Sequence, residues 1–208
     1  CGVSGYINFK NKPIEKNILL NMCKTLRHRG PDGYGIFEDK YFGLSHTRLS
    51  IIDLTKNASQ PMISKDGRYV ISYNGEVFNF KEIKKNLVSL GYNFKSNSDS
   101  EVVLYSLIHW GIDSLSKFNG QFALAFWDKK TKTLILARDR YGIKPMYYFR
   151  NDKSFVFGSE IKALFCNPEV RVQINKKGLL EYLTFQNFLS NQTLFENVNI
   201  LNPGTFLI

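Results

Sequence analysis

The hydrophobic and polar positions of the chain predict several short strands interleaved with amphipathic helices. Apolar residues recur at helical spacing over residues 14–26 and 77–90, and Gly91 is placed to end the second helix. Shorter helical patterns cover residues 160–165 and 176–183. Runs rich in β-branched and aromatic residues predict strands over residues 3–9, 34–38, 41–46, 69–73, 121–127, 133–137, 145–149 and 155–158. Clusters of antiparallel strands between paired helices are typical of a layered α+β fold.

Two local signals refine this pattern. Ser98, with Glu101 three positions later, forms a capping-box sequence that predicts a helix from there to about Trp110. Asn74-Gly75 ends the predicted strand 69–73 and, taken alone, favours a tight hairpin turn. A helical pattern follows this dipeptide rather than a second strand, which weakens the hairpin interpretation.

The chain is expected to contain one main domain and a short extension. Its 208 residues are enough to bury most of the apolar surface of one large domain. We place that domain at residues 1–186 and a turn-rich extension at residues 187–208. The extension ends on the strand-like residues 205–208. A chain that stops within a strand pattern is expected to be part of a longer protein.

Composition excludes several classes of function. The hydrophobic fraction of 43% is that of a globular protein, and no apolar run approaches the length of a membrane span. No secretory signal or anchor is visible, so a cytoplasmic protein is expected. The net charge of +10 invites a nucleic-acid interpretation, but the lysines are spread over turns and helix faces without a compact basic tract. We therefore expect neither nucleic-acid nor membrane partners.

Cys1 carries the first candidate chemistry. A first-residue cysteine has a thiol and a free α-amine together, and an α-amine can accept a proton near neutral pH because its ordinary pKa is about 8. The residues after Gly2 would fix this nucleophile at the end of a buried strand, as N-terminal nucleophile hydrolases require. The alternative is that Cys1 is simply the residue left after processing of the N-terminus.

Asn74 and Gly75 offer two neutral hydrogen-bond donors. The Asn74 amide and the Gly75 backbone N–H, pointed at one place, would form an oxyanion hole for a tetrahedral intermediate. The competing interpretation is the hairpin turn described above.

Arg48 and Asp99 are the candidate groups for binding an amino acid. Arg48 stands in an apolar segment, and a guanidinium suits capture of a carboxylate; the alternative is a surface arginine or an ion pair with Asp53. Asp99 follows the predicted N-cap, where a carboxylate complements the helix dipole, but it could instead hold an ammonium group. Together the two could bind both ends of a zwitterion.

Other reactive residues are expected to be structural. The three histidines show no metal-ligand spacing, and no glycine-rich phosphate loop is present, so no metal and no nucleotide cofactor is expected here. The three cysteines do not form a disulfide framework. Cys23 and Cys166 are expected to be buried thiols.

The ordered set of motifs resembles the class II glutamine amidotransferase domain of the glutamine-hydrolysing asparagine synthetase family. Its members in this chain are Cys1-Gly2-Val3-Ser4-Gly5, Arg27-His28-Arg29-Gly30-Pro31-Asp32-Gly33, Ser45-His46-Thr47-Arg48-Leu49-Ser50-Ile51-Ile52-Asp53, Tyr73-Asn74-Gly75-Glu76-Val77-Phe78-Asn79, Ser98-Asp99-Ser100-Glu101, Gly120-Gln121-Phe122-Ala123, Arg138-Asp139-Arg140-Tyr141-Gly142-Ile143-Lys144-Pro145 and Gly158-Ser159-Glu160-Ile161-Lys162. Each motif alone is weak, but together they cover nearly the whole chain in the order of the family.

The resemblance implies a four-layer αββα sandwich of two antiparallel sheets and a glutaminase that releases ammonia from L-glutamine. It implies that Cys1 is the nucleophile and that Asn74 and Gly75 are the oxyanion hole. Arg48 would bind the α-carboxylate, and Glu76 and Asp99 would receive the α-amino group. The remaining implied pocket residues are Leu49, Ser50, Ile51 and Ile52. The motifs around Arg29 and Asp139 receive wall and structural roles only.

The family continues into a synthetase domain that uses ATP and Mg, and this chain contains no match to its pyrophosphate loop. No cofactor is expected for the glutaminase half, and ATP and Mg would belong to the absent synthetase domain. The acceptor is expected to be aspartate, although relatives amidate sugar acids. Three alternatives stay open: the glutaminase half of a phosphoribosyl, hexosamine or glutamate synthase enzyme, another hydrolase with an N-terminal cysteine, and a non-catalytic regulatory domain. A homodimer is left open.

Overall fold

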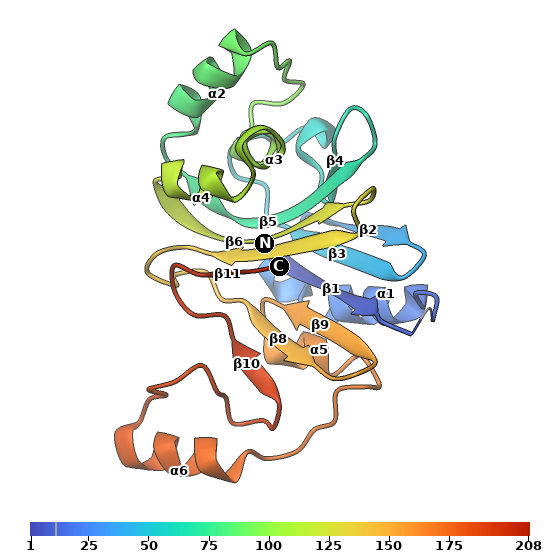
Figure 1. The fold of residues 1–208 in the computed structure, drawn as a ribbon, viewed down its shortest axis with the longest axis vertical. Coiled ribbons are helices and arrows are strands. Elements are labelled where there is room, and N and C mark those ends of the chain that lie inside the picture. The colour runs from blue at the N-terminus through green and yellow to red at the C-terminus, as the bar shows by residue number, and fades with distance from the viewer. Residues whose placement is uncertain (11) are drawn as a thin grey trace.

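Two antiparallel sheets lie face to face at the centre of the molecule (Figure 1). The computed structural model describes residues 1–10 and 12–208. In this part of the chain, one sheet has six strands in the order β10 (Val198–Ile200), β8 (Tyr147–Arg150), β9 (Ser154–Gly158), β1 (Gly2–Asn8), β3 (Phe42–Arg48) and β2 (Gly33–Asp39). The other has five in the order β11 (Phe206–Leu207), β7 (Thr133–Arg138), β6 (Gly120–Asp128), β5 (Tyr69–Val77) and β4 (Met62–Ile63).

Helices cover the outer face of each sheet and complete four layers (Figure 1). The six-stranded sheet is covered by α1 (Lys16–Thr25) and α5 (Ile161–Leu164). The five-stranded sheet is covered by α3 (Asp99–Trp110), with α2 (Phe80–Ser89) and α4 (Ser114–Lys117) beside it. Helix α6 (Lys176–Phe185) lies apart from both sheets, and short 3-10 turns occupy Arg27–Arg29, Lys56–Ala58 and Gly111–Asp113. The expected αββα sandwich is confirmed.

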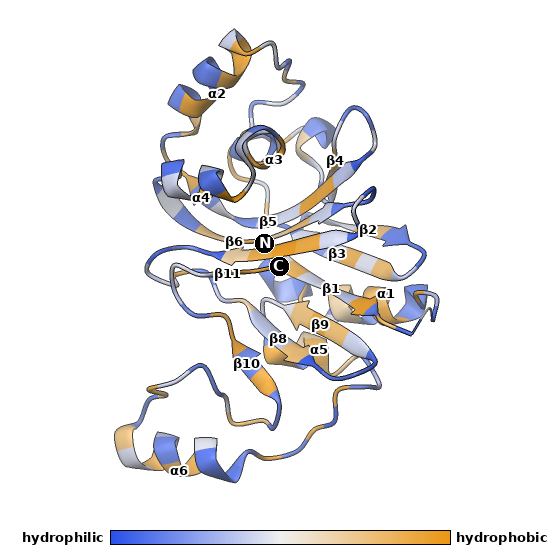
Figure 2. Ribbon diagram, in the orientation of Figure 1, coloured by the Kyte–Doolittle hydropathy of each residue, from blue (hydrophilic) through white to orange (hydrophobic). Residues whose placement is uncertain are grey.

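Three hydrophobic clusters fill the three spaces between these layers. The cluster between the sheets includes Val3, Val70 and Ala123, and the stacked rings of Phe42 and Trp127, 4.3 Å apart, join β3 to β6 across it. The other two clusters lie under α2 and α3 and under α1 and α5. Strand β6 is hydrophobic along its centre because both of its faces are covered (Figure 2).

The element order expected from the sequence is confirmed, except around Asn74. There β5 does not end: it continues to Val77 and pairs with β6 as far as Gly120, so the hairpin interpretation is wrong. Pairing with β6, a strand far away in the sequence, outweighs the local turn preference of Asn74-Gly75. Glycine is needed at position 75 because a Cβ there would lie 2.3 Å from the Gln121 carbonyl oxygen of β6.

The capping box was predicted correctly in position but not in its bonds. Ser98 is the N-cap of α3, with extended backbone, yet its side chain accepts no hydrogen bond from the helix. Glu101 turns instead to the preceding loop, where it accepts the N–H groups of Lys95 and Ser96 and the Ser96 hydroxyl. The three donors of that loop are stronger competitors for the carboxylate than the single N-cap amide.

The C-terminal segment contributes two short edge strands that the sequence pattern did not resolve in full. Strand β10 pairs with β8, and β11, within the expected strand-like end, pairs with β7. The proposed domain boundary after residue 186 stays a prediction. Gly91 has the positive φ of +93° expected at the end of α2.

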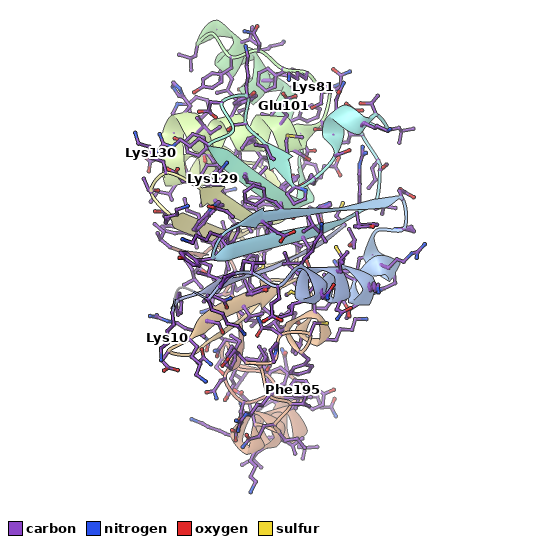
Figure 3. The ribbon with its side chains drawn as sticks, turned by 90° about the vertical axis from the view of Figure 1, so that its right-hand side faces the viewer. Lys10, Lys81, Glu101, Lys129, Lys130 and Phe195 are labelled. Atoms are coloured by element: carbon purple, nitrogen blue, oxygen red, sulfur yellow. The ribbon has the colours of Figure 1, made fainter. Side chains whose placement is uncertain are left out.

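Cysteine burial and surface charge follow the sequence-based expectations with one exception. Cys23 is buried as expected, whereas Cys166 is only half-buried, its sulfur 3.4 Å from the Thr25 hydroxyl. Figure 3 shows lysines on separate parts of the surface, among them Lys10, Lys81 and Lys129. None of the described helices is both long and apolar enough to cross a lipid bilayer.

Candidate active site

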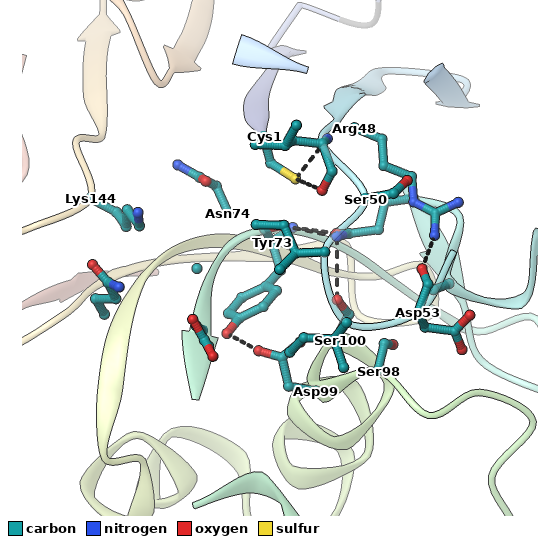
Figure 4. A pocket seen from close by; sticks show the side chains of 18 residues that line it. Cys1, Arg48, Ser50, Asp53, Tyr73, Asn74, Ser98, Asp99, Ser100 and Lys144 are labelled. Carbon is teal, nitrogen blue, oxygen red and sulfur yellow. Dashed lines mark hydrogen bonds between the residues drawn. The ribbon is translucent and has the colours of Figure 1, made fainter. Parts of the chain in front are cut away.

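A cavity of about 230 Å³ opens beside Cys1, directly before β1 (Figure 4). It lies between the start of β1, the loop after β3, the end of β5 and the first turn of α3. Every site residue expected from the sequence lines it: Cys1, Arg48, Leu49, Ser50, Ile51, Ile52, Asn74, Gly75, Glu76 and Asp99. Residues up to 98 positions apart in the sequence are thus brought to one cavity by the fold.

Main-chain groups hold both functional ends of Cys1. The α-amine donates to the Arg29 carbonyl oxygen at 2.8 Å. The Leu49 N–H donates to the Cys1 sulfur at 3.4 Å, and the thiol lies 3.6 Å from the Leu49 carbonyl oxygen. An N–H pointing at the sulfur stabilises a thiolate. Cys1 is therefore held against the β3–β4 loop.

The α-amine of Cys1 is suited to accept a proton at neutral pH. Burial lowers its pKa from an ordinary 8.0 to about 6, and the positive charges of Arg29 and Lys144 act in the same direction, against Asp32. At pH 7 most of the amine is therefore neutral, beside the thiol of the same residue.

Gly2 lies where the backbone has no room for a side chain. A Cβ at this residue would lie 2.6 Å from the Thr47 hydroxyl oxygen and 3.1 Å from the Leu26 Cβ. Glycine is needed at this position so that β1 can approach β3 and the end of α1 closely.

Asn74 carries a buried donor that the protein itself does not use. Its side chain is 4% exposed, and within the described residues Nδ2 has no hydrogen-bond partner. Buried polar groups in native proteins are nearly always paired, so an unpaired amide N–H at a cavity wall indicates a donor kept for a ligand. Gly75 follows it in β5 and lines the same cavity.

Arg48 is held by a carbonyl and not by a carboxylate. One terminal nitrogen of its guanidinium donates to the main-chain oxygen of Asp53. The Asp53 carboxylate accepts instead from the N–H and hydroxyl of Thr55 and from the Asn97 N–H. The alternative of an Arg48–Asp53 ion pair is therefore wrong, and the guanidinium has no carboxylate partner among the described residues.

Asp99 lies deep in the cavity wall, 4% exposed, at the first turn of α3. Its Oδ2 accepts the Tyr73 hydroxyl at 2.6 Å and the Val77 N–H at 3.0 Å, which ties α3 to β5. Burial raises the pKa of this carboxyl group above its ordinary value. A cationic group entering the cavity would compensate that burial.

The apolar part of the cavity wall is open to solvent. Leu49, Ile51 and Ile52 are 43%, 72% and 40% exposed, so this loop forms a rim. The Ser50 N–H donates to the Asp32 carboxylate at 2.7 Å, which anchors the loop to the segment before β2.

The structure adds cavity residues that the sequence did not single out. Lys144 lies across the cavity from Arg48 (Figure 4), and Gln60 is fixed to Tyr73 by two hydrogen bonds of 2.6 and 3.0 Å. The motif around Asp139 was the available signal for Lys144: that buried carboxylate accepts four backbone N–H groups, including that of Lys144, and so shapes the loop. Arg29, from another motif given only a wall role, contacts Cys1 directly.

His46, a buried histidine, lies outside the cavity. His46 is fully buried between the sheets, with its Nδ1 2.9 Å from the Ser72 hydroxyl and its Nε2 without a partner among the described residues. Burial lowers the pKa of His46 to about 3, and the nearby positive N-terminus and Arg48 contribute. The described residues contain no group of three or more His, Cys, Asp or Glu side chains that could hold a metal ion.

Comparisons with known proteins agree with this geometry. The model of a family described as "glutamine amidotransferase domain" matches residues 1–208. Asparagine synthetase [glutamine-hydrolyzing] 3 of Bacillus subtilis is 39% identical over 87% of this chain, and asparagine synthetase [glutamine-hydrolyzing] 1 of the same organism is 36% identical over 99%. The chain spans only 30% and 33% of the length of these two relatives.

A solved structure agrees in fold. The glutamine phosphoribosylpyrophosphate amidotransferase of B. subtilis superposes on 80% of this chain with a TM-score of 0.68 at 21% identity. The chain thus shares the fold of this amidotransferase, with two facing antiparallel sheets and Cys1 directly before a central strand of one of them. The match of the family model shows that the chain belongs to the glutamine amidotransferase domain family.

Proposed function

We propose that this domain hydrolyses L-glutamine through a covalent thioester on Cys1. The observation that carries the proposal is the meeting in one cavity of a thiol, an α-amine whose pKa is about 6, and the unpaired amide donor of Asn74. Acyl transfer requires a nucleophile, a base and an oxyanion donor, and these three groups supply them. No cofactor takes part in this half-reaction.

The reaction would proceed through four proton-balanced steps. The Cys1 amine takes the thiol proton, and the thiolate attacks the carboxamide carbon of glutamine. The oxyanion that forms accepts hydrogen bonds from the Asn74 Nδ2 and the Gly75 N–H. The protonated amine then gives its proton to the departing nitrogen, and ammonia leaves as the γ-glutamyl thioester forms. The amine then takes a proton from water, the hydroxide cleaves the thioester, and the amine returns its proton to the departing sulfur. The γ-carboxylic acid that forms loses its remaining proton to solvent and leaves as glutamate.

Substrate binding would use the opposite charges on two sides of the cavity. Arg48 would bind the α-carboxylate of glutamine, because its guanidinium has no carboxylate partner in the described chain. Asp99 and Glu76 would receive the α-amino group, and the loop containing Leu49, Ser50, Ile51 and Ile52 would lie along the side chain. An α-ammonium beside Asp99 would offset the burial of that carboxylate.

The product ammonia would serve a second, ATP-dependent domain. The two relatives named above are asparagine synthetases about three times as long as this chain, which favours a C-terminal synthetase partner that uses ATP and Mg and aminates aspartate. Other carboxylate acceptors, a homodimer and a cytoplasmic location stay predictions.

Intact mass spectrometry after reaction with 6-diazo-5-oxo-norleucine, an electrophilic glutamine analogue, tests the chemistry. We expect one adduct on Cys1, prevented by excess glutamine and absent in Cys1→Ala. Cys23→Ser and Cys166→Ser are matched controls that should still be labelled once. Glutamine hydrolysis should follow the same pattern. Labelling of another cysteine, or equal glutaminase rates in wild type and Cys1→Ala, would refute the proposal.

A further inference from the structure

One motif of the sequence lies outside the cavity and has no role in the reaction described so far. Gly158-Ser159-Glu160-Ile161-Lys162 leads from β9 into α5, and none of its residues lines the cavity. Glu160 is the N-cap residue of α5, but its side chain makes no cap hydrogen bond with that helix. Its carboxylate is therefore used elsewhere.

Arg29 holds Cys1 from two directions. The Arg29 carbonyl oxygen accepts the Cys1 amine at 2.8 Å, and the Arg29 Nε donates to the Cys1 carbonyl oxygen at 3.0 Å. The main-chain oxygen of Arg29 thus binds the amine of Cys1 and its side chain binds the carbonyl oxygen, so both ends of the first residue are held by one residue. The direction of the amine, and hence its distance from the thiol, depends on where Arg29 lies.

Glu160 in turn holds the guanidinium of Arg29. Its Oε1 accepts from the Arg29 terminal nitrogen at 3.0 Å and lies 2.8 Å from the His28 Nε2, while its Oε2 lies 3.1 Å from the Lys162 Nζ. The Arg29 and Glu160 side chains are each only 24% exposed. Although burial opposes ionisation, the hydrogen bonds from Arg29, His28 and Lys162 lower the pKa of Glu160 to about 2. The carboxylate is therefore charged at any pH at which the enzyme would work.

The chain of contacts closes on itself at the N-terminus. Ser159, next to Glu160, accepts the Val3 N–H on its hydroxyl at 2.9 Å and donates its own N–H to the Val3 carbonyl oxygen at 2.8 Å. The segment containing Glu160 is thus bound to β1 at Val3, two residues after Cys1. The Glu160 side chain is also connected to Cys1 itself through Arg29. A free chain terminus is usually mobile, but this closed ring of hydrogen bonds restricts the movement of the first residue.

We propose that Glu160 is a positioning residue for glutamine hydrolysis, whose carboxylate holds Arg29 so that the amine and thiol of Cys1 keep their reactive arrangement. The inference rests on the proposed function and adds a residue that touches neither substrate nor reacting atoms. A fold-stabilising ion pair would affect only the amount of folded protein. A positioning residue affects the rate of each folded molecule, because small misplacements of reacting groups are costly in rate.

Steady-state glutaminase kinetics of Glu160→Ala, with the fraction of folded protein measured by thermal unfolding, provide the first test. We expect kcat to fall about tenfold or more, with KM within about twofold of wild type, because Arg48 and Asp99 are untouched. Glu160→Gln keeps an acceptor oxygen for Arg29 and should recover most of the rate. Glu160→Asp, which keeps the charge but is one methylene shorter, should lose rate and gives the same comparison if Glu160→Ala does not fold.

A second readout does not depend on glutamine. The rate at which iodoacetamide alkylates Cys1, followed by peptide mass spectrometry, should also fall about tenfold in Glu160→Ala, since the thiol loses its placed base. This readout separates the two proposals: a domain that does not hydrolyse glutamine contradicts the proposed function, whereas an unchanged Cys1 alkylation rate contradicts the role of Glu160.

Two comparisons decide whether the effect runs through Arg29. Lys162→Ala removes only the Oε2 partner and should leave kcat and alkylation within about twofold of wild type. In an Arg29→Ala background, Glu160→Ala should add less than about a twofold change, because the group that it holds is already gone. Equal losses from Glu160→Ala in both backgrounds, or a tenfold loss from Lys162→Ala, would overturn the inference.

Discussion

Replacement of Asn74 by alanine is the most direct perturbation of the proposed oxyanion hole. The Nδ2 of Asn74 is buried at the cavity and has no partner within the described part of the protein. The folded state therefore gains nothing from this donor, whereas the transition state of glutamine hydrolysis would gain a hydrogen bond. The variant should separate catalysis from stability.

Asn74→Ala should lower kcat much more than it lowers the free energy of unfolding. Loss of one oxyanion donor lowers kcat by about 100- to 1000-fold, or roughly 3–4 kcal/mol of transition-state stabilisation. Truncation of the small buried side chain should cost about 1 kcal/mol of unfolding free energy, since no hydrogen bond of Nδ2 is broken. KM should change little, because the substrate carboxylate and ammonium bind elsewhere.

The matched control is Ser72→Ala, two residues earlier on the same face of β5. The Ser72 hydroxyl lies 2.9 Å from the His46 Nδ1, so its loss leaves a buried ring without that partner and should cost about 1–3 kcal/mol of stability. Glutamate release per molecule titrated with the electrophilic analogue should stay near the wild-type rate in Ser72→Ala and fall at least about 100-fold in Asn74→Ala. A kcat of Asn74→Ala within a few-fold of wild type, or an equal loss in both variants, would refute the reasoning.

Three further predictions concern Cys1, Arg48 and His46. Since the Cys1 amine acts only when neutral and its pKa is about 6, kcat/KM should fall about tenfold per pH unit below that value; a fall that begins near 8 would contradict the burial of the amine. Arg48→Lys, which loses the planar fork, should raise KM about tenfold or more with kcat within a few-fold in steady-state assays, and a fall in kcat alone would contradict its binding role. The pKa of His46 is about 3 in the folded protein and about 6.5 unfolded, so the unfolded state binds the extra proton. Stability should therefore fall as pH drops below 6.5, by up to about 1.4 kcal/mol per pH unit in urea titrations, and His46→Gln should flatten this slope.

The sequence predicted elements wherever the hydrophobic pattern is long enough to show a period. Strand β6 and helix α2 are examples. Gly91 predicted the end of α2, and its φ is positive in the structure. The two-residue strand β4 has no period to detect. Asn74-Gly75 shows the opposite difficulty: a strong local turn signal was overridden by pairing with β6, which begins more than forty residues later.

The site was predictable in its residues but not in its bonds. The motif order identified the residues that line the cavity, yet no local pattern indicates that Arg48 binds the Asp53 carbonyl or that Asp99 shares its Oδ2 between Tyr73 and Val77. Each of these bonds depends on how loops and layers meet in three dimensions. Arg29 was missed as a partner of Cys1 for the same reason, and Glu160 was missed as a partner of Arg29, from which 131 positions separate it.

The sandwich itself sets the spacing between Cys1 and Asn74, the proposed nucleophile and the proposed oxyanion donor. Cys1 precedes a central strand of one sheet, and Asn74 lies in a central strand of the other. Their separation is therefore the separation of the sheets, which the buried cluster containing Val3, Val70 and Ala123 determines. A close-packed interior holds such a distance to within small fluctuations. Cys1 itself is not part of this buried cluster. Its two hydrogen bonds to Arg29 therefore orient the chain end, which core packing alone does not fix.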